Sequence, residues 1–190
     1  NMQFKERFQN WMSKKKQADF MFVQHMISVL KNNGRMAVVM PHGVLFRGGE
    51  EQKMRQRLIM GSESHPSCIL ECVIGLPQGL FYGTGIPASL LIINKANATN
   101  RQGVFFINAD REYKEGKNQN SLRPEDIEKI SYVYHNKIEI EGYSRLVSKE
   151  TLKAEDYNCN IRRYVDNSEP PTPQDVKAHL QGGIPEAELL

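Results

Sequence analysis

The glycine-rich connection over residues 75–87 constrains the fold of this chain more than any other feature. It joins two apolar runs, residues 70–74 and 88–93, each of which has the length of a buried strand. Its glycines and prolines are Gly75, Pro77, Gly79, Gly83, Gly85 and Pro87. That composition disfavours a crossover helix, and a strand that follows without one should pair antiparallel with a neighbour. The sequence therefore predicts that residues 88–93 form a reversed strand.

A parallel part of the sheet is predicted from the preceding residues. Residues 36–40 are a continuous apolar run, a pattern that favours a strand covered on both faces, as in parallel sheets. A charged helix predicted over residues 50–60 separates this run from residues 70–74, and a strand–helix–strand unit of this kind places its two strands parallel. We therefore expect an α/β fold with a mostly parallel sheet and one reversed strand, with residues 104–107 as a further strand at an edge.

Three more helices are predicted from spacing and capping. Residues 17–31 carry an apolar stripe at helical spacing. The stripe consists of Phe20, Val23, Ile27 and Leu30, widened by Phe22 and Met26. Residues 124–135 begin with a proline, which suits a first helical turn, and residues 148–154 begin with a serine, which suits an N-cap. The proline-rich stretch at residues 168–173 is predicted to be extended.

Composition limits the class of protein and its compartment. With 39% apolar and 25% charged residues, the chain is typical of a soluble globular protein. The net charge of +3 is too small to indicate a nucleic-acid partner by itself. Three cysteines without a dense framework favour reduced thiols in the cytoplasm and give no zinc pattern. No apolar run approaches the roughly 20 residues of a membrane helix, and no secretory signal opens the chain.

Two features suggest a binding site, although the common catalytic signatures are absent. His42 follows the strand predicted at residues 36–40, at the carboxyl end where open α/β sheets bind ligands. The alternative for His42 is a loop histidine bonded to backbone. Phe81 and Tyr82 lie in the glycine-rich loop, where an aromatic face stacks on a nucleic-acid base for about 1–3 kcal/mol. The alternative is that both rings pack beneath the loop.

Five segments together resemble the modification subunits of type I restriction–modification systems. They are residues 18–20 (ADF), 34–49 (GRMAVVMPHGVLFRGG), 73–87 (VIGLPQGLFYGTGIP), 116–120 (GKNQN) and 156–165 (DYNCNIRRYV). They occur in the order and spacing of that family and span roughly residues 15–185. None of them is a catalytic signature by itself, but jointly they are specific.

The resemblance implies a class I S-adenosylmethionine-dependent methyltransferase fold, whose sheet ends in a reversed strand. The family transfers a methyl group to the N6 atom of adenine in duplex DNA. Its catalytic tetrapeptide, Asn-Pro-Pro-Phe or Asn-Pro-Pro-Tyr, and its glycine-containing cofactor motif precede the helix that opens this chain, and neither occurs in this sequence. We therefore expect the chain alone to be inactive and to carry only part of a cofactor site.

The resemblance also implies a pocket for the target base. An adenine amine inside a duplex is out of reach, so the base has to be flipped into such a pocket. Phe81 matches the family's aromatic residue that packs against the flipped base, and Tyr82 stands beside it. Pro41 and His42 match the loop that borders the same pocket. The implied target-base residues are thus Pro41, His42, Phe81 and Tyr82.

On the same grounds, Ala18, Asp19 and Phe22 match the stretch that lines one side of the adenosine of S-adenosylmethionine. For Phe22 the alternative is a core position, because it also falls on the apolar stripe of its helix. The implied partners are double-stranded DNA, a specificity subunit and a restriction subunit. An apolar sheet edge left uncovered favours association, so we expect this chain to self-associate.

The resemblance divides the chain into three parts. Residues 1–109 correspond to the C-terminal half of the methyltransferase domain, residues 110–167 to a helical extension, and residues 168–190 to a proline-rich tail. Two alternatives stay open at this point: a methyltransferase of the same fold that acts on RNA or on a protein, and a degenerate methyltransferase domain that serves as a scaffold.

Overall fold

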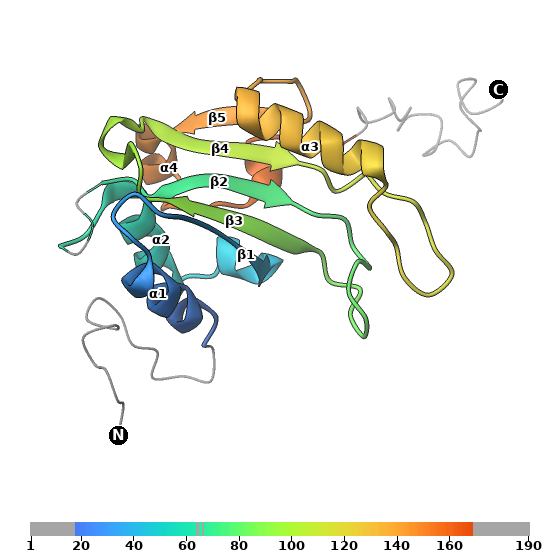
Figure 1. Ribbon diagram of the computed structural model, residues 1–190, viewed down its shortest axis with the longest axis horizontal. Helices are drawn as coiled ribbons and strands as arrows, with labels where there is room; N and C mark the ends of the chain where they lie inside the picture. The colour runs from blue at the N-terminus through green and yellow to red at the C-terminus, as the bar shows by residue number, and fades with distance from the viewer. Residues whose placement is uncertain (1–17, 64, 66, 169–190) are drawn as a thin grey trace, which may run out of the picture.

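The structure, a computed structural model, describes residues 18–63, 65 and 67–168. Within these residues, one five-stranded sheet forms the centre of the molecule (Figure 1). Its strands are β1 (Arg35–Pro41), β2 (Leu70–Gly75), β3 (Ala88–Asn94), β4 (Gly103–Asn108) and β5 (Ser144–Ser148). Their order across the sheet is β1-β3-β2-β4-β5, so the third strand along the chain lies between the first two. Of the tail predicted from residue 168 onward, all but Ser168 lies outside the described residues.

Strand β3 is reversed, as the glycine-rich connection predicts. It pairs antiparallel with β1 on one side and with β2 on the other, whereas β2 and β4 are parallel neighbours. Strands β1, β2 and β4 therefore run in one direction, which confirms that residues 36–40 and 70–74 are parallel although they are not adjacent. Because β3 lies between them, only one neighbouring pair in the described sheet is parallel.

Strand β5 was not predicted, and it changes two expectations. It pairs antiparallel with β4, so the sheet has a second reversed strand and β4 is an interior strand rather than an edge. Only Ser144 and Val147 are buried in β5, a pattern too short for periodicity to reveal. Residues 110–167 thus contribute a strand to the same sheet; the division of the chain into domains stays a prediction.

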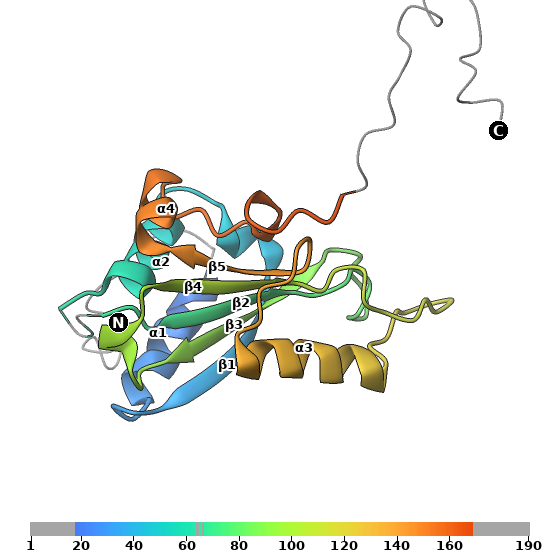
Figure 2. The same cartoon turned by 90° about the horizontal axis from the view of Figure 1, so that it is seen from above.

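The predicted helices are confirmed, and they cover both faces of the sheet. Helices α1 (Asp19–Val29), α2 (Glu50–Met60) and α4 (Lys149–Ala154) pack on one face, and α3 (Pro124–Asn136) packs on the other. Figure 2 shows α3 on the side of the sheet opposite to α2 and α4. The Ser148 hydroxyl accepts a hydrogen bond from the Thr151 amide at 3.1 Å, which is the predicted N-cap of α4.

Two burial predictions were wrong. Strand β1 is not covered on both faces: Ala37 and Val39 are exposed, while Met36, Val38 and Met40 contact the core beneath α1 and α2. Helix α3 packs over β2 and β4 and leaves this face of β1 open. On α1, the side chain of Phe22 is 65% exposed, so Phe22 does not belong to the core stripe of its helix.

The described helices are short, and none of them is long and apolar enough to cross a membrane. All three cysteines are buried and free. Among the described residues, no group of three or more histidine, cysteine or carboxylate side chains is arranged to hold a metal ion.

Candidate functional site

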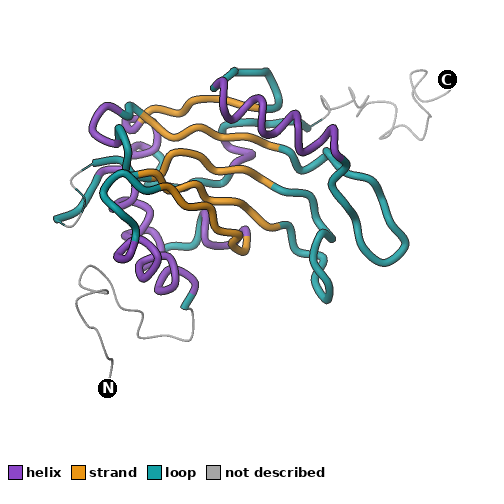
Figure 3. Tube along the Cα trace, in the orientation of Figure 1, coloured by secondary structure: helices purple, strands orange, loops and turns teal. Residues whose placement is uncertain are grey.

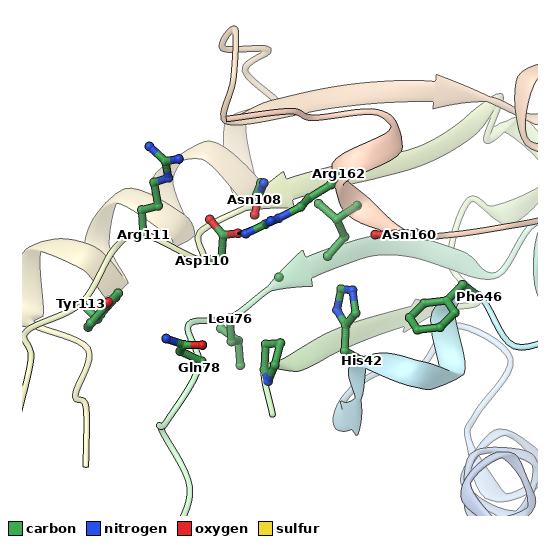
Figure 4. Close-up of a pocket in the computed structure, with 13 residues that line it drawn as sticks. His42, Phe46, Leu76, Gln78, Asn108, Asp110, Arg111, Tyr113, Asn160 and Arg162 are labelled. Carbon is green, nitrogen blue, oxygen red and sulfur yellow. Dashed lines mark hydrogen bonds and ion pairs between the residues drawn. The ribbon is translucent and has the colours of Figure 1, made fainter. Parts of the chain in front are cut away.

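A pocket of about 460 Å³ opens at one end of the sheet (Figure 4). Strands β1, β2 and β4 run in the same direction, so their carboxyl ends meet at this end, where open α/β sheets bind ligands. His42 follows β1, Gly75 is the last residue of β2 and Leu76 follows it. Asn108 is the last residue of β4, and Asp110 lies two residues beyond it. All five residues line the pocket. The sequence predicted one of them, His42.

A second wall of the pocket comes from residues 157–167, here called the strap. The strap includes the short 3₁₀ turn η4 (Ile161–Arg163), and its residues Asn160, Ile161 and Arg162 line the pocket. Ile161 packs against the bare backbone of Gly75: a Cβ atom added at Gly75 would lie 2.8 Å from Ile161 Cδ1. The strap overlaps the 156–165 segment that carries the family resemblance, but the pattern alone did not place it at the site.

Hydrogen bonds fasten the strap to the end of β4. The Asn108 side-chain amide donates to the Val165 carbonyl at 3.0 Å. Asp110 accepts from Arg162 at 2.8 Å and from the Asn167 side-chain amide at 2.6 Å. Figure 4 shows Arg162 and Asp110 pointing toward each other across the pocket wall. Charge-assisted bonds of this kind fix the pocket wall in register with the sheet.

Arg55 of α2 fastens the other end of the strap. Its guanidinium donates to three backbone carbonyls, those of Tyr157, Val44 and Arg47, each at 2.8 Å. Val44 belongs to η2 (His42–Leu45), the 3₁₀ turn that begins with His42. One buried side chain therefore holds the turn that carries His42 and the strap that carries Asn160 in a fixed relation.

The His42 ring is partly buried and points toward Asn160 (Figure 4). Burial lowers the pKa of His42, the positive Arg162 acts in the same direction, and the Asn160 side chain opposes them in part. The imidazole is therefore neutral near pH 7. His42 Nδ1 and Asn160 Oδ1 are both buried, and neither makes a hydrogen bond of full geometry to a described residue, although Asn160 lies close enough to His42 to raise its pKa in part. An unsatisfied buried polar atom costs about 1–3 kcal/mol, so the two atoms are suited to a polar ligand.

The glycine-rich loop over residues 75–87, here called the aromatic loop, carries its two rings beside the pocket rather than in it. Phe81 is 45% exposed and Tyr82 is 85% exposed, so the alternative that both pack beneath the loop is wrong. The two ends of the loop, Gln78 and Pro87, line the pocket, whereas Phe81 and Tyr82 do not. Pro41 is exposed and pairs with Ala88 at the other end of the same loop.

The three residues expected to bind a cofactor lie at the start of α1. Asp19 is within 3.7 Å of Arg47, which follows η2, so the start of α1 is linked to the turn that begins with His42. Ala18 directly precedes the helix, and Phe22 presents its ring to solvent. None of these three side chains lines the pocket at the strand ends.

Comparison with known proteins gives consistent matches over most of the chain. The sequence model of the N-6 DNA methylase family matches residues 1–171. The chain is 35% identical over 171 residues to the type I restriction enzyme MjaVII methylase subunit of Methanocaldococcus jannaschii, covering 88% of this chain and 28% of that protein. It is 31% identical over 160 residues to the MpnII methylase subunit of Mycoplasma pneumoniae, covering 84% of this chain and 28% of that protein.

The solved structures agree with the sequence matches. The structure of the type I restriction-modification system methyltransferase subunit from Streptococcus thermophilus superposes with a TM-score of 0.76 and 39% sequence identity. The match covers 86% of this chain and 34% of the other. The predicted α/β methyltransferase fold is thereby confirmed, but the mostly parallel pairing expected for its sheet was wrong, because three of the four neighbouring pairs in the described sheet are antiparallel. The chain spans little more than a quarter of the length of the curated relatives it matches.

Proposed function

Since this chain belongs to the N-6 DNA methylase family, we propose that it is part of a type I restriction–modification methyltransferase. The protein transfers a methyl group from S-adenosylmethionine to the N6 atom of adenine in duplex DNA. The observation that carries this proposal is the pocket at the carboxyl ends of β1, β2 and β4, with exposed aromatic rings beside it. Its volume lies in the range of pockets that bind small organic ligands.

We infer that the pocket and the loop receive a flipped base. A base that leaves the duplex needs polar partners for its edge and an aromatic face for its ring. The neutral His42 and the unpaired oxygen of Asn160 offer the polar partners, without the cost of burying a charge against a neutral base. Phe81 and Tyr82, which follow Gln78 at the pocket rim, offer the ring face.

The cofactor residues are compatible with one side of an adenosine. Phe22 has an exposed ring that can pack on a planar purine, and the carboxylate of Asp19 is partly exposed and can accept hydrogen bonds from hydroxyl groups. S-adenosylmethionine supplies an electrophilic methyl group when bound. Because the Asn-Pro-Pro-Phe/Tyr tetrapeptide does not occur in this sequence, we propose that the chain alone transfers no methyl group and that its role is to hold the base and the adenosine.

The proposed partners follow from the family. Double-stranded DNA is the substrate, a specificity subunit selects the sequence, and a restriction subunit completes the system. The matched proteins are themselves named as subunits of type I restriction enzymes, which supports an assembly of this kind.

Methyl transfer by the full-length methylase, assembled with its specificity subunit, tests the proposal. Labelled S-adenosylmethionine is incubated with DNA, and the product is digested to nucleosides. We expect the label in N6-methyladenine. Label in methylcytosine, or label in RNA or protein but not in DNA, would contradict the proposed substrate.

Two matched tyrosine variants connect the activity to the aromatic loop. Tyr82→Ala removes a ring that is 85% exposed on the loop, and Tyr132→Ala removes a ring that is 61% exposed on α3. Loss of a stacked base should lower kcat/KM for DNA by about tenfold, and Phe81→Ala should do the same. Tyr132→Ala should leave kcat/KM unchanged; an equal loss in all three variants would contradict a site at the loop.

A further inference from the structure

A hairpin over residues 114–121, which follows β4, forms hydrogen bonds to the aromatic loop just before Phe81 and Tyr82. Figure 3 shows both loops extending beyond the same end of the sheet. The Asn120 backbone amide donates to the Gly79 carbonyl at 2.9 Å. The Asn120 side chain donates to the Gln78 carbonyl at 2.9 Å, and the Gln119 side chain donates to the Leu80 carbonyl at 2.6 Å. Three consecutive carbonyls, ending one residue before Phe81, are thus held by two adjacent hairpin residues.

The hairpin is itself fixed, so it can act as a support. Lys114 and Ser121 exchange backbone hydrogen bonds at 2.8 and 3.0 Å. The Asn120 side-chain oxygen accepts from the Gly116 amide at 3.3 Å, which orients its nitrogen toward the loop. At Gly116 an added Cβ would lie 2.0 Å from the Gln119 carbonyl oxygen, so the turn requires glycine. Gln119 and Asn120 therefore meet the loop from a defined backbone.

The loop meets the hairpin at a glycine and has an open tip. Gly79 has φ +69°, a left-handed conformation that favours glycine, and a Cβ there would meet Asn120 Nδ2 at 3.1 Å. Beyond the two rings, Gly83 and Gly85 have no described atom within 4 Å of a Cβ position. The tip thus has little packing of its own, whereas Leu80 packs against the core under α3.

We propose that Gln119 and Asn120 are positioning residues, which hold the aromatic loop in the conformation in which Phe81 and Tyr82 meet the DNA base. Neither side chain lines the pocket, so both act through the loop. A long loop with few contacts samples many conformations, and fixing it beforehand removes an ordering cost from binding. The identity of the ligand rests on the proposed function, but the support of the loop does not.

Limited chymotrypsin digestion of the full-length methylase tests the support. Phe81 and Tyr82 are exposed cleavage sites, and cleavage requires the loop to open locally. Asn120→Ala and Gln119→Ala each remove a side-chain bond to the loop, so we expect cleavage after these rings to become about tenfold faster. Asn118→Ala is the matched control, since Asn118 lies exposed on the same hairpin and makes no hydrogen bond to a described residue.

The effect of this support on base binding is tested with DNA that carries 2-aminopurine at the target position. We expect the Asn120→Ala and Gln119→Ala proteins to show less flipped-base fluorescence and a KM for DNA raised about tenfold, with unchanged affinity for S-adenosylmethionine. Asn120→Asp keeps the acceptor for Gly116 but loses the donor to the loop, so it should behave like Asn120→Ala. Asn118→Ala should match the wild type.

The digestion tests whether Gln119 and Asn120 support the loop, and the DNA assays test whether this support positions the rings. Unchanged cleavage in both the Asn120→Ala and Gln119→Ala proteins would overturn the support itself. Faster cleavage with an unchanged KM for DNA would overturn the positioning role. If Tyr82→Ala and Phe81→Ala leave kcat/KM for DNA unchanged while Asn120→Ala still accelerates cleavage, the proposed function fails and the support stands. The Gln119→Ala protein serves where Asn120→Ala does not fold.

Discussion

A single buried arginine organises the site at the scale of one residue. Arg55 lies in α2 with 3% of its surface exposed, and its guanidinium satisfies three carbonyls from two distant segments. Burial lowers the pKa of Arg55, but nearby carbonyls and the carboxylate of Glu51 favour its charged form. The arginine thus adds to the backbone hydrogen bond that joins the η2 turn to the strap, from the Cys159 amide to the Leu45 carbonyl.

Arg55→Met should therefore destabilise the fold and loosen the pocket wall. The methionine fills part of the volume but leaves three buried carbonyls unsatisfied, which should cost about 3 kcal/mol or more. The measurement is urea unfolding of this chain at constant pH. Lys53→Met on the exposed face of the same helix is the control and should change stability by less than about 0.5 kcal/mol. Equal stability of the two variants would contradict the role of Arg55.

A second residue-scale prediction concerns pH. His65 is buried, and burial, assisted by the positive Lys95 and Arg57, lowers its pKa. Because the unfolded chain binds the proton more readily, the neutral His65 contributes stability that is complete above about pH 6.5 and is lost as the pH falls toward the lowered pKa. We expect His65→Gln to flatten the fall in stability between about pH 7 and pH 5. An unchanged pH slope in urea titrations would contradict this.

At the scale of elements, a polar cluster joins α3 to the sheet. Glu71, at the irregular register of β2, accepts hydrogen bonds from the Tyr134 hydroxyl at 2.9 Å and from the Asn94 side chain at 3.0 Å. Burial by itself would raise the pKa of Glu71, but these bonds and the nearby Lys137 lower it overall. Lys137 also lies 3.8 Å from the centre of the Tyr134 ring. The carboxylate therefore links strands β2 and β3 to helix α3.

Tyr134→Phe should weaken this connection without altering the packing of the ring. Loss of one bond to a charged group should lower the free energy of unfolding by about 1.5–3 kcal/mol. Tyr132→Phe, on the exposed side of the same helix, is the control and should have no measurable effect in the same urea titration. A loss of stability as large in the control would show that the hydroxyl bond to Glu71 is not its cause.

Across the whole molecule, local sequence patterns predicted the helices and most strands. They could not predict the pocket wall, because its contacts join residues far apart in the sequence. The apolar runs of β1, β2 and β3 and the stripe of α1 are local, so their type and the reversal of β3 followed from sequence. The pocket wall depends on contacts between residues far apart, such as the Cys159 amide with the Leu45 carbonyl at 2.8 Å. No periodicity carries that information. His42 was therefore predicted at the site, whereas Asn160 and Asp110 were not.

Exposed apolar residues give a prediction for the molecule as a whole. Phe22, Met26 and Val29 follow one another at helical spacing on the outer side of α1, and they are 65%, 37% and 61% exposed. A contiguous apolar stripe favours association, so this chain should self-associate at high concentration. Static light scattering should show a mass above 21.8 kDa that falls for Phe22→Ser. A mass that stays monomeric at every concentration would contradict this.

The aromatic loop between β2 and β3 is closed by backbone pairing at its base and has little packing at its tip. Pairing of the Leu76 amide with the Ala88 carbonyl at 3.0 Å closes the base, while Gly83 and Gly85 stand in open space. Doubling the length of such a loop costs only about 0.6 kcal/mol in closure entropy. Insertions at the tip would therefore change how far the rings reach while the sheet keeps its register.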